Sequence, residues 1–231
     1  MSAVRILSTK KLDYGPKQYL LNAGFSVLEA DFINTRPVAF DFGRVTGNLI
    51  FTTKNAVESV VLQPGWEQLK SHPVFCVGEK TRALLLEKGF SVAHWAHYSA
   101  ELADQIRQYA TENFTFFCGN LRMDTMPMSM KVAGISFREI EVYETILSPT
   151  QVTSAIDAIL FYSPSGVQSY LQQNTIGNQI CFCIGTTTAA AVQPYTSRVV
   201  VAKKPTIESV IMTCIKYYES PIKSEVNFHL N

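Results

Sequence analysis

Four segments of the chain share one pattern: an apolar, strand-like run, then glycine or hydroxyl residues, then a helix-like sequence. They are Leu49–Val57, Phe75–Thr81, Leu160–Val167 and Cys183–Thr188. In each half of the chain a turn of hydroxyl residues comes first and a glycine-threonine turn follows. Such repetition predicts two related α/β halves, in which helices begin at the carboxyl ends of parallel strands. These helix N-termini carry unpaired N–H groups and partial positive charge, so they favour anionic ligands.

Strand-like and helix-like segments alternate along almost the whole chain, and most of the strands are continuous apolar runs. This alternation predicts doubly wound parallel sheets with helices on both faces. Strands are expected near Val4–Thr9, Phe25–Ile33, Asn48–Thr53, Val74–Val77, Ser91–Trp95, Phe114–Cys118, Phe137–Tyr143, Ala158–Tyr162, Ile180–Ile184 and Arg198–Ala202. Helices are expected near Pro16–Asn22, Ala56–Leu62, Lys80–Lys88, Ala100–Ala110, Met123–Val132, Gly166–Gln173, Thr188–Val192 and Thr206–Tyr217.

The number of strands predicts that one domain is discontinuous. Five strands between Asn48 and Tyr143 are enough for a complete sheet, whereas only three follow Ser148. The β-α-β unit at the N-terminus supplies the missing two. We therefore expect one α/β domain of residues 1–34 and 148–231, an inserted α/β domain of residues 41–138, and a two-stranded linker of residues 35–40 and 139–147. Pro37 favours an extended entry into this linker, and such a hinge places a ligand in the cleft between two domains.

Composition argues against several classes of function. The net charge is only +1 and no basic stripe is present, so nucleic acid is not an expected partner. No signal peptide and no membrane-spanning run is recognised, so we expect a cytoplasmic protein without a membrane partner. The cysteines are expected to be buried free thiols in a reducing compartment. Cys181-x-Cys183 and His94-x-x-His97 lack a matching second pair, and no metal is expected.

Two turns in the second half of the chain suit an anionic ligand. The Ser163–Gly166 turn combines hydroxyls with a glycine that permits close backbone approach, and the Gly185–Thr188 turn offers three hydroxyls at a helix start. Ordinary helix capping is the alternative explanation for both turns. Neither turn is a Walker or dinucleotide motif, which disfavours a nucleotide-handling enzyme. The candidate ligand-binding residues here are Ser163, Ser165, Gly166, Thr187 and Thr188.

The first half of the chain has corresponding candidates. Phe117–Arg122 ends a strand with glycine, asparagine and arginine, and Arg122 would clamp a carboxylate through two hydrogen bonds. The alternative for Arg122 is a solvated helix residue. Tyr143 lies in the predicted linker, where a phenol either packs or faces the ligand as a hydrogen-bond or proton donor. The candidate ligand-binding residues of this half are Thr52, Thr53, Asn55, Gly119, Asn120 and Arg122.

In this order the motifs resemble those of the uroporphyrinogen-III synthase family. The resemblance spans nearly the whole chain and rests on the joint order of short motifs. These are Leu49-Ile-Phe-Thr-Thr53, Val77-Gly-Glu-Lys-Thr81, Phe117-Cys-Gly-Asn-Leu-Arg122, Val142-Tyr-Glu-Thr145, Tyr162-Ser-Pro-Ser-Gly166, Ile184-Gly-Thr-Thr-Thr188 and Lys204-Pro-Thr206. The family's fold has two α/β domains, one of them discontinuous, joined by a two-stranded linker.

The resemblance implies an enzyme that cyclises hydroxymethylbilane, a linear tetrapyrrole with eight carboxylates, to uroporphyrinogen III. Water is lost and ring D is inverted through a spiro intermediate, and neither a cofactor nor a metal is implied. Tyr143 matches the family's favoured proton donor. Thr52, Thr81 and Thr187 match cleft positions that bind or orient the substrate, with Ser165 beside them.

The sequence departs from the family pattern at a few positions. Asn55 stands where many members have arginine, which puts one carboxylate contact in doubt, and Thr186 stands where proline is common. Lys203-Lys204 is more basic than usual, and a polar tail follows Tyr218. The competing interpretation is a non-catalytic, two-domain module of the same fold that binds an anionic ligand. We expect a monomer that transiently contacts the bilane-forming enzyme.

Overall fold

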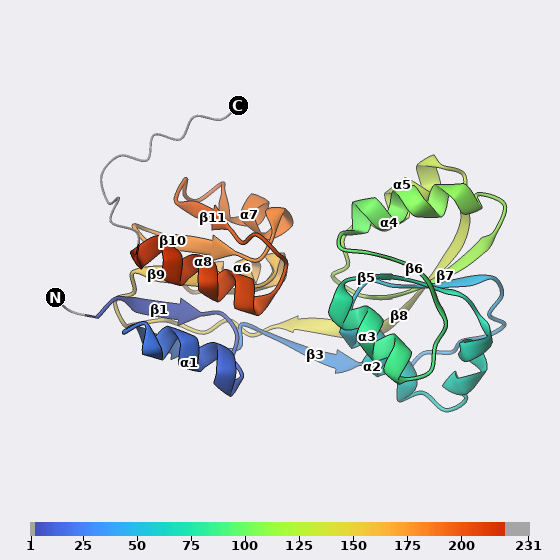
Figure 1. The fold of residues 1–231 in the computed structure, drawn as a ribbon, viewed down its shortest axis with the longest axis horizontal. Helices are drawn as coiled ribbons and strands as arrows, with labels where there is room; N and C mark the ends of the chain where they lie inside the picture. Colours follow the sequence, from blue (N-terminus) through green and yellow to red (C-terminus); the bar gives the residue numbers. More distant parts are fainter. Residues whose placement is uncertain (1–2, 220–231) are drawn as a thin grey trace. The chain divides into compact units, whose positions relative to one another are not determined.

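The computed structural model describes residues 3–219, which fold into two compact units. Unit 1 combines the first 34 residues with the chain from Leu147 onward, and unit 2 is the intervening segment Thr35–Ile146. The chain passes between the units along β3 (Ile33–Pro37) and β8 (Ser136–Leu147), which lie side by side (Figure 1). The polar tail from residue 220 onward lies outside the described residues.

Unit 2 contains a six-stranded sheet in the order β3-β8-β7-β4-β5-β6. From β8 to β6 all neighbouring strands are parallel. α2 and α3 pack on one face of this sheet, and α4 and α5 pack on the other. The further elements are β4 (Asn48–Phe51), α2 (Lys54–Val61), the 3₁₀ helix η1 (Trp66–Ser71), β5 (Val74–Val77), α3 (Glu79–Glu87), β6 (Val92–Ala96), α4 (Ser99–Ile106), the 3₁₀ helix η2 (Arg107–Tyr109), β7 (Asn113–Gly119) and α5 (Thr125–Val132).

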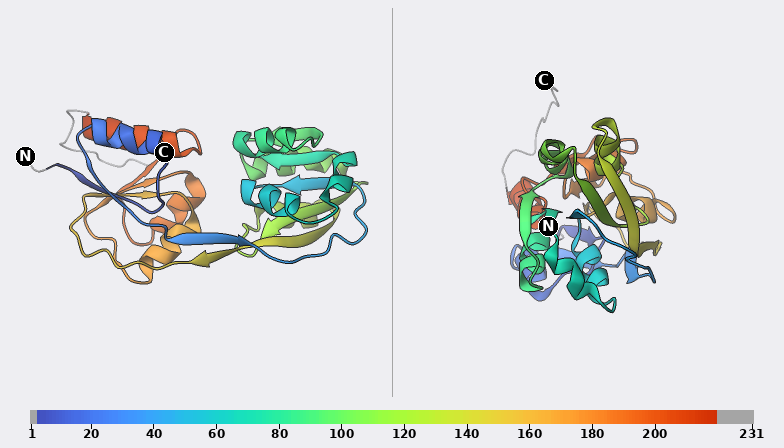
Figure 2. Two further views of the ribbon diagram at one scale, coloured as in Figure 1. Left: turned by 90° about the horizontal axis from the view of Figure 1, so that it is seen from below. Right: turned by 90° about the vertical axis from the view of Figure 1, so that its right-hand side faces the viewer.

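Unit 1 contains a five-stranded parallel sheet in the order β11-β10-β9-β1-β2. α6 and α7 cover one face, and α1 and α8 lie side by side on the other (Figure 2). Its elements are β1 (Arg5–Ser8), α1 (Tyr14–Asn22), β2 (Ser26–Glu29), β9 (Ala158–Phe161), α6 (Pro164–Leu171), β10 (Ile180–Cys183), α7 (Thr186–Val192), β11 (Val199–Val201) and α8 (Ile207–Glu219).

The two units are circular permutations of one architecture. Numbered along the chain from β4, the parallel strands of unit 2 have the spatial order 3-2-1-4-5. Numbered from β9 and continued with β1 and β2, the strands of unit 1 have the same order. This confirms the prediction of two similar, doubly wound parallel sheets, and it makes β4 the counterpart of β9 and β7 the counterpart of β1.

Continuous apolar strands lie at the centre of both sheets. All four residues of β4 and of β9 are buried, as expected for parallel strands covered on both faces. In unit 2 the rings of Phe51 and Phe117 stack with their centroids 5.0 Å apart. Burial of an aromatic ring of this kind contributes about 1.5–3 kcal/mol. Packing of these buried side chains therefore holds the carboxyl ends of the strands in place.

The structure corrects the prediction at both crossings between the units. The single strand expected at Phe25–Ile33 is two strands, β2 and β3, which belong to different sheets. Asp31 lies between them, and its carboxylate accepts a hydrogen bond from the Lys11 N–H at 2.8 Å. The predicted linker of residues 139–147 is largely a sheet strand, because β7 extends to Gly119 and pairs with β8 as far as Tyr143.

All five cysteines are buried free thiols, as predicted. Burial raises the pKa of Cys76, Cys181, Cys183 and Cys214 to about 12 and the pKa of Cys118 to about 11. An exposed thiol has a pKa of 9.0 on the same scale. The folded protein therefore keeps these protons over a pH range in which the unfolded chain loses them.

We expect the free energy of unfolding to fall as the pH rises above about 9, because the folded state then binds more protons than the unfolded state. Each thiol removes about 1.4 kcal/mol per pH unit until its folded pKa is reached. Urea unfolding near neutral pH and at about pH 10 measures the change. Replacing Cys183 by alanine should make the fall shallower, and equal free energies at the two pH values would contradict the expectation.

Candidate functional site

In each unit the strand order reverses at one point, where two central neighbouring strands send their following helices to opposite faces of the sheet. In unit 2 this point lies between β4 and β7, and in unit 1 it lies between β9 and β1. Ligands of open α/β sheets bind outside the carboxyl ends of the strands at such switch points. The candidate functional residues are therefore those in the loops that follow these four strands.

Thr53 lies at the switch point of unit 2 and connects β4 to β8. Its Oγ1 accepts a hydrogen bond from the Ala56 N–H at 3.2 Å, which makes Thr53 the N-cap of α2. The same hydroxyl donates to the phenol oxygen of Tyr143 at 3.2 Å. Because the phenol oxygen accepts this bond, its own proton remains available for donation to a ligand.

Tyr143 is buried in unit 2, with 8% of its surface exposed. Burial raises the pKa of its phenol, and the hydrogen bond from Thr53 opposes this shift. Tyr143 therefore stays protonated at neutral pH, as a hydrogen-bond donor or weak acid. Its predicted place on a linker is corrected: Tyr143 is a sheet residue whose hydroxyl lies at the carboxyl end of β4.

A β-bulge brings Tyr143 to this place. Cys118 pairs with Glu141, but the next residue, Gly119, pairs with Tyr143, so that Val142 is skipped. The bulge interrupts the alternation of side chains along β8, and Val142 and Tyr143 both lie in the same core cluster. Gly119 is required here, because a Cβ at this position would lie 2.5 Å from Cζ of Tyr143.

The side chains of Asn120 and Arg122 have hydrogen-bond partners within the protein. Asn120 Oδ1 accepts a hydrogen bond from the Thr145 N–H at 2.8 Å. Arg122 donates to both carboxylate oxygens of Glu139, at 2.6 and 2.8 Å, and to Asp124 at 2.5 Å. The hydrogen bond to Glu139 raises the pKa of Arg122 above the usual value of an arginine. The carboxylates of Glu139 and Asp124 are bonded to the guanidinium N–H groups with which Arg122 would bind a substrate carboxylate.

Ser163 caps α6 in unit 1 as Thr53 caps α2 in unit 2. Its Oγ accepts a hydrogen bond from the Gly166 N–H at 3.0 Å and lies 3.0 Å from Ser165 Oγ. The structure thus brings Ser163, Ser165 and Gly166 together at the switch point of unit 1. Capping accounts for one hydroxyl, and Ser165 retains further hydrogen-bonding capacity.

Thr9 belongs to the same switch point and is absent from the predicted set. Its hydroxyl donates to Leu160 O at 2.8 Å, and a Cβ on Gly166 would lie 3.8 Å from it. Leu7-Ser8-Thr9 repeats the pattern of an apolar strand that runs into hydroxyl residues. This signal could have identified Thr9, although β1 lies far from β9 in the sequence.

The other predicted threonines differ in exposure. Thr187, the second residue of α7, is exposed, whereas Thr188 and Thr81 are buried at the third residue of α7 and α3. Contact between either buried hydroxyl and a ligand would require local rearrangement. Thr52 and Asn55 flank the Thr53 cap and are half-buried, so they stay candidate contacts.

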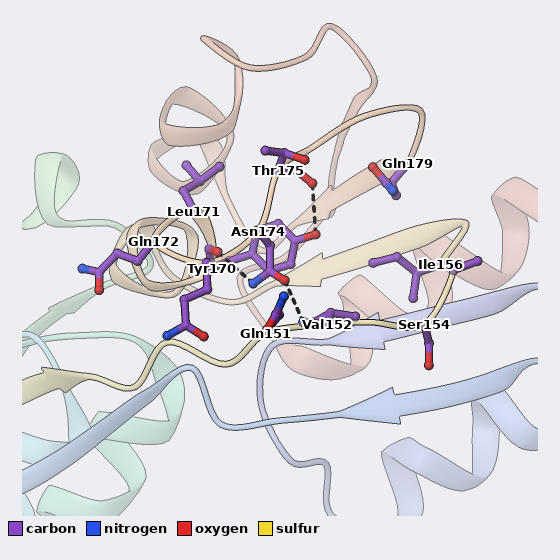
Figure 3. Close-up of a pocket in the computed structure, with 12 residues that line it drawn as sticks. Gln151, Val152, Ser154, Ile156, Tyr170, Leu171, Gln172, Asn174, Thr175 and Gln179 are labelled. Atoms are coloured by element: carbon purple, nitrogen blue, oxygen red, sulfur yellow. Dashed lines mark hydrogen bonds between the residues drawn. The ribbon is translucent and has the colours of Figure 1, made fainter.

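A hollow of about 520 Å³ in unit 1 lies away from these loops, at the amino ends of the strands (Figure 3). Its walls are the segment that leads into β9 and the end of α6. Asn174 links them by accepting a hydrogen bond from the Val152 N–H and donating to Thr150 O, both at 2.8 Å. All its lining side chains are uncharged, and the negative end of α6 lies beside it, so it does not suit a ligand with several carboxylates.

Residues of the His94-x-x-His97 and Cys181-x-Cys183 motifs pack against other side chains of the protein. His94 lies 2.5 Å from the Tyr109 hydroxyl and stacks on Phe75 with the ring centroids 4.8 Å apart. Cys181 and Cys183 are both buried in one core cluster of unit 1. Between residues 3 and 219 no three His, Cys, Asp or Glu side chains are grouped so that they could hold a metal ion. Over the same residues no helix has the length and apolar character needed to cross a bilayer.

Comparison with known proteins places the chain among enzymes of one kind. Residues 17–212 match the family described as uroporphyrinogen-III synthase HemD. The structure is similar to uroporphyrinogen-III synthetase from Helicobacter pylori, with 19% identity and a TM-score of 0.69, over 93% of this chain and 99% of that chain. It is also similar to a mutant uroporphyrinogen III synthase from Thermus thermophilus, with 14% identity and a TM-score of 0.65, over 94% and 99% of the two chains. At these identities the solved structures support the α/β fold alone.

Proposed function

Because the chain belongs to the uroporphyrinogen-III synthase family of tetrapyrrole biosynthesis, we propose that it cyclises hydroxymethylbilane to uroporphyrinogen III. The terminal hydroxyl of the substrate takes up a proton and leaves as water, which produces an azafulvene electrophile. Ring D attacks this electrophile through its substituted carbon and forms a spiro intermediate. The intermediate then breaks and rejoins with ring D inverted, which classes the reaction as that of a cyclising lyase.

The observation that carries the proposal is the contact between Thr53 and Tyr143 at the switch point of unit 2. It leaves the phenol proton available where a ligand of an open α/β sheet binds. We assign Tyr143 to proton or hydrogen-bond donation toward the leaving hydroxyl. Its raised pKa keeps it protonated at neutral pH, so it acts as a weak acid, and the larger task of the protein is to hold the substrate so that the correct carbon meets the electrophile.

Backbone groups are the proposed binding groups for the substrate carboxylates. The caps of α2 and α6 lie at the two switch points, and helix N-termini favour anions. The net charge of +1 supplies no surplus of cationic side chains, and Arg122 is paired with Glu139 and Asp124. We propose Thr52, Asn55, Ser165 and Thr187 as the side chains that contact the substrate.

One assay tests the function. Hydroxymethylbilane is generated in situ, the protein is added, and the uroporphyrinogen isomers are separated. Formation of isomer III above the spontaneous isomer I background is the expected result. Isomer I alone, from a folded sample, would contradict the proposal and would favour the non-catalytic anion-binding module, an interpretation to which the burial of Tyr143 lends support.

Replacing Thr187 by valine should weaken binding of substrate or product. Thr187 is exposed at the N-terminal turn of α7, and a neutral hydrogen bond contributes about 0.5–1.5 kcal/mol, which corresponds to roughly 2- to 10-fold in the dissociation constant. Titration with the uroporphyrinogen III product measures the effect. Thr111→Val, at another exposed threonine, is the matched control. Unchanged binding by a folded Thr187→Val protein would show that the Thr187 hydroxyl does not contact the ligand.

We also propose that the protein is a cytoplasmic monomer that receives its substrate by transient contact with the bilane-forming enzyme. Sedimentation of the purified protein over a range of concentrations tests the oligomeric state. A concentration-dependent dimer would contradict the proposal that the protein is a monomer.

A further inference from the structure

We propose that Asn120 is a positioning residue, which holds β8 in the register that places the Tyr143 phenol on Thr53. The inference rests on the proposed role of Tyr143 in the reaction. In this role Asn120 does not contact the substrate. It affects the reaction through the position of β8, which carries Tyr143.

Asn120 extends the pairing of β8 beyond the end of β7. Regular pairing ends at Gly119, and the Asn120 N–H then donates to Tyr143 O at 3.3 Å. The side-chain amide of Asn120 takes the place of a further strand residue: its Oδ1 accepts from the Thr145 N–H at 2.8 Å and its Nδ2 donates to Thr145 O at 3.4 Å. Asn120 thereby contacts the backbone of β8 at Tyr143 and two residues beyond it.

The bulge is the reason why this support matters. Skipping Val142 leaves one residue of β8 without a partner on β7, and a bulge weakens the ladder locally. On its other side β8 is held by β3 and the residue that follows it, through the ion pair between Arg36 and Glu144 and the bond from the Val38 N–H to Val142 O at 3.1 Å. Without the Asn120 side chain, the bond from the residue 120 N–H to Tyr143 O is the last contact that β8 makes on the β7 side. A slip by one residue there would turn the Tyr143 side chain to the opposite face of the sheet.

Coupling between two substitutions separates this role from substrate binding. Oδ1 and one N–H of the Asn120 amide are bonded to Thr145, whereas the second N–H of Nδ2 can donate to a ligand without breaking those bonds. If Asn120 acts through β8 alone, a variant that loses the amide loses activity only to the extent that Tyr143 is misplaced. This makes the proposal measurable as coupling between two substitutions.

The test is a double-mutant cycle of Asn120→Ala and Tyr143→Phe. In the wild-type background Asn120→Ala should lower kcat by about 10-fold with little change in KM. In the Tyr143→Phe background the same substitution should lower kcat by less than about 2-fold. Asn113→Ala, at the opposite end of β7, is the matched control and should leave kcat unchanged. Equal losses in both backgrounds, or a loss confined to KM, would overturn the proposal.

Hydrogen exchange gives a readout that does not depend on activity. The Thr145 N–H is bonded to Asn120 Oδ1, so its exchange should accelerate by at least about 10-fold in Asn120→Ala and stay unchanged in Asn113→Ala. Asn120→Asp keeps the acceptor for this N–H and should retain much of the protection. Unchanged exchange in Asn120→Ala would overturn the proposal. If the wild-type protein forms no isomer III, the proposed function fails, while this measurement still decides whether Asn120 holds β8.

Discussion

Replacing Gly119 by alanine should lower the formation of isomer III by about 100-fold, because displacement of a reacting group by about 1 Å costs that much. A Cβ on residue 119 would lie 2.5 Å from Cζ, 2.6 Å from Cε2 and 2.9 Å from the hydroxyl oxygen of Tyr143. All three distances are shorter than the 3.4–4 Å of an ordinary van der Waals contact. The ring is enclosed in the core of unit 2, so it must move away from Gly119 and lose its contact with Thr53.

The loss of activity should be accompanied by a smaller loss of stability. Overpacking a core position costs about 1–3 kcal/mol, and urea unfolding measures it. Gly177→Ala is the matched control, because a Cβ there meets only Gln179 Oε1 at 3.6 Å. A Gly119→Ala protein with wild-type turnover would show that the position of the Tyr143 ring does not matter for the reaction.

Replacing Tyr143 by phenylalanine should lower kcat by about 10- to 100-fold without abolishing turnover. A proton donor contributes about 100-fold at the lower end of the range for general acids, and a phenol is a poor acid at neutral pH. Because the phenol donates during departure of the hydroxyl, the change should appear in kcat more than in KM. Assays with hydroxymethylbilane generated in situ, with separation of the isomers, measure both quantities.

Tyr170→Phe separates this effect from the general cost of removing a buried phenol. Tyr170 is 2% exposed and its hydroxyl donates to Thr175 O at 3.3 Å, remote from the switch point of unit 1. Both substitutions should lower stability by about 0.5–1.5 kcal/mol. Only Tyr143→Phe should lower kcat, and wild-type turnover in that variant would remove Tyr143 from the mechanism.

The candidate site was predictable where it depends on local sequence. Thr53 and Ser163 each follow an apolar strand and precede a helix, and both serve as N-caps at a switch point. The partners of the Gly119–Arg122 turn within the protein were not predictable, because its composition suits a ligand as well as it suits β8. Arg122 meets Glu139, and Asn120 meets Thr145, only after β7 and β8 have paired. Partners this far apart in the sequence leave no periodic signal.

The sequence by itself determined the two related α/β halves and the helix starts that follow their strands, because apolar periodicity and capping are properties of neighbouring residues. It also determined that one half is discontinuous, through the order of strand-like segments. Only the tertiary structure decided where Tyr143 lies and what surrounds it. The bulge opposite Gly119 shifts the register of β8, and a shift of one residue changes which face a side chain occupies. The free energy that selects that register comes from packing and pairing between distant strands, so no segment of the sequence specifies it alone.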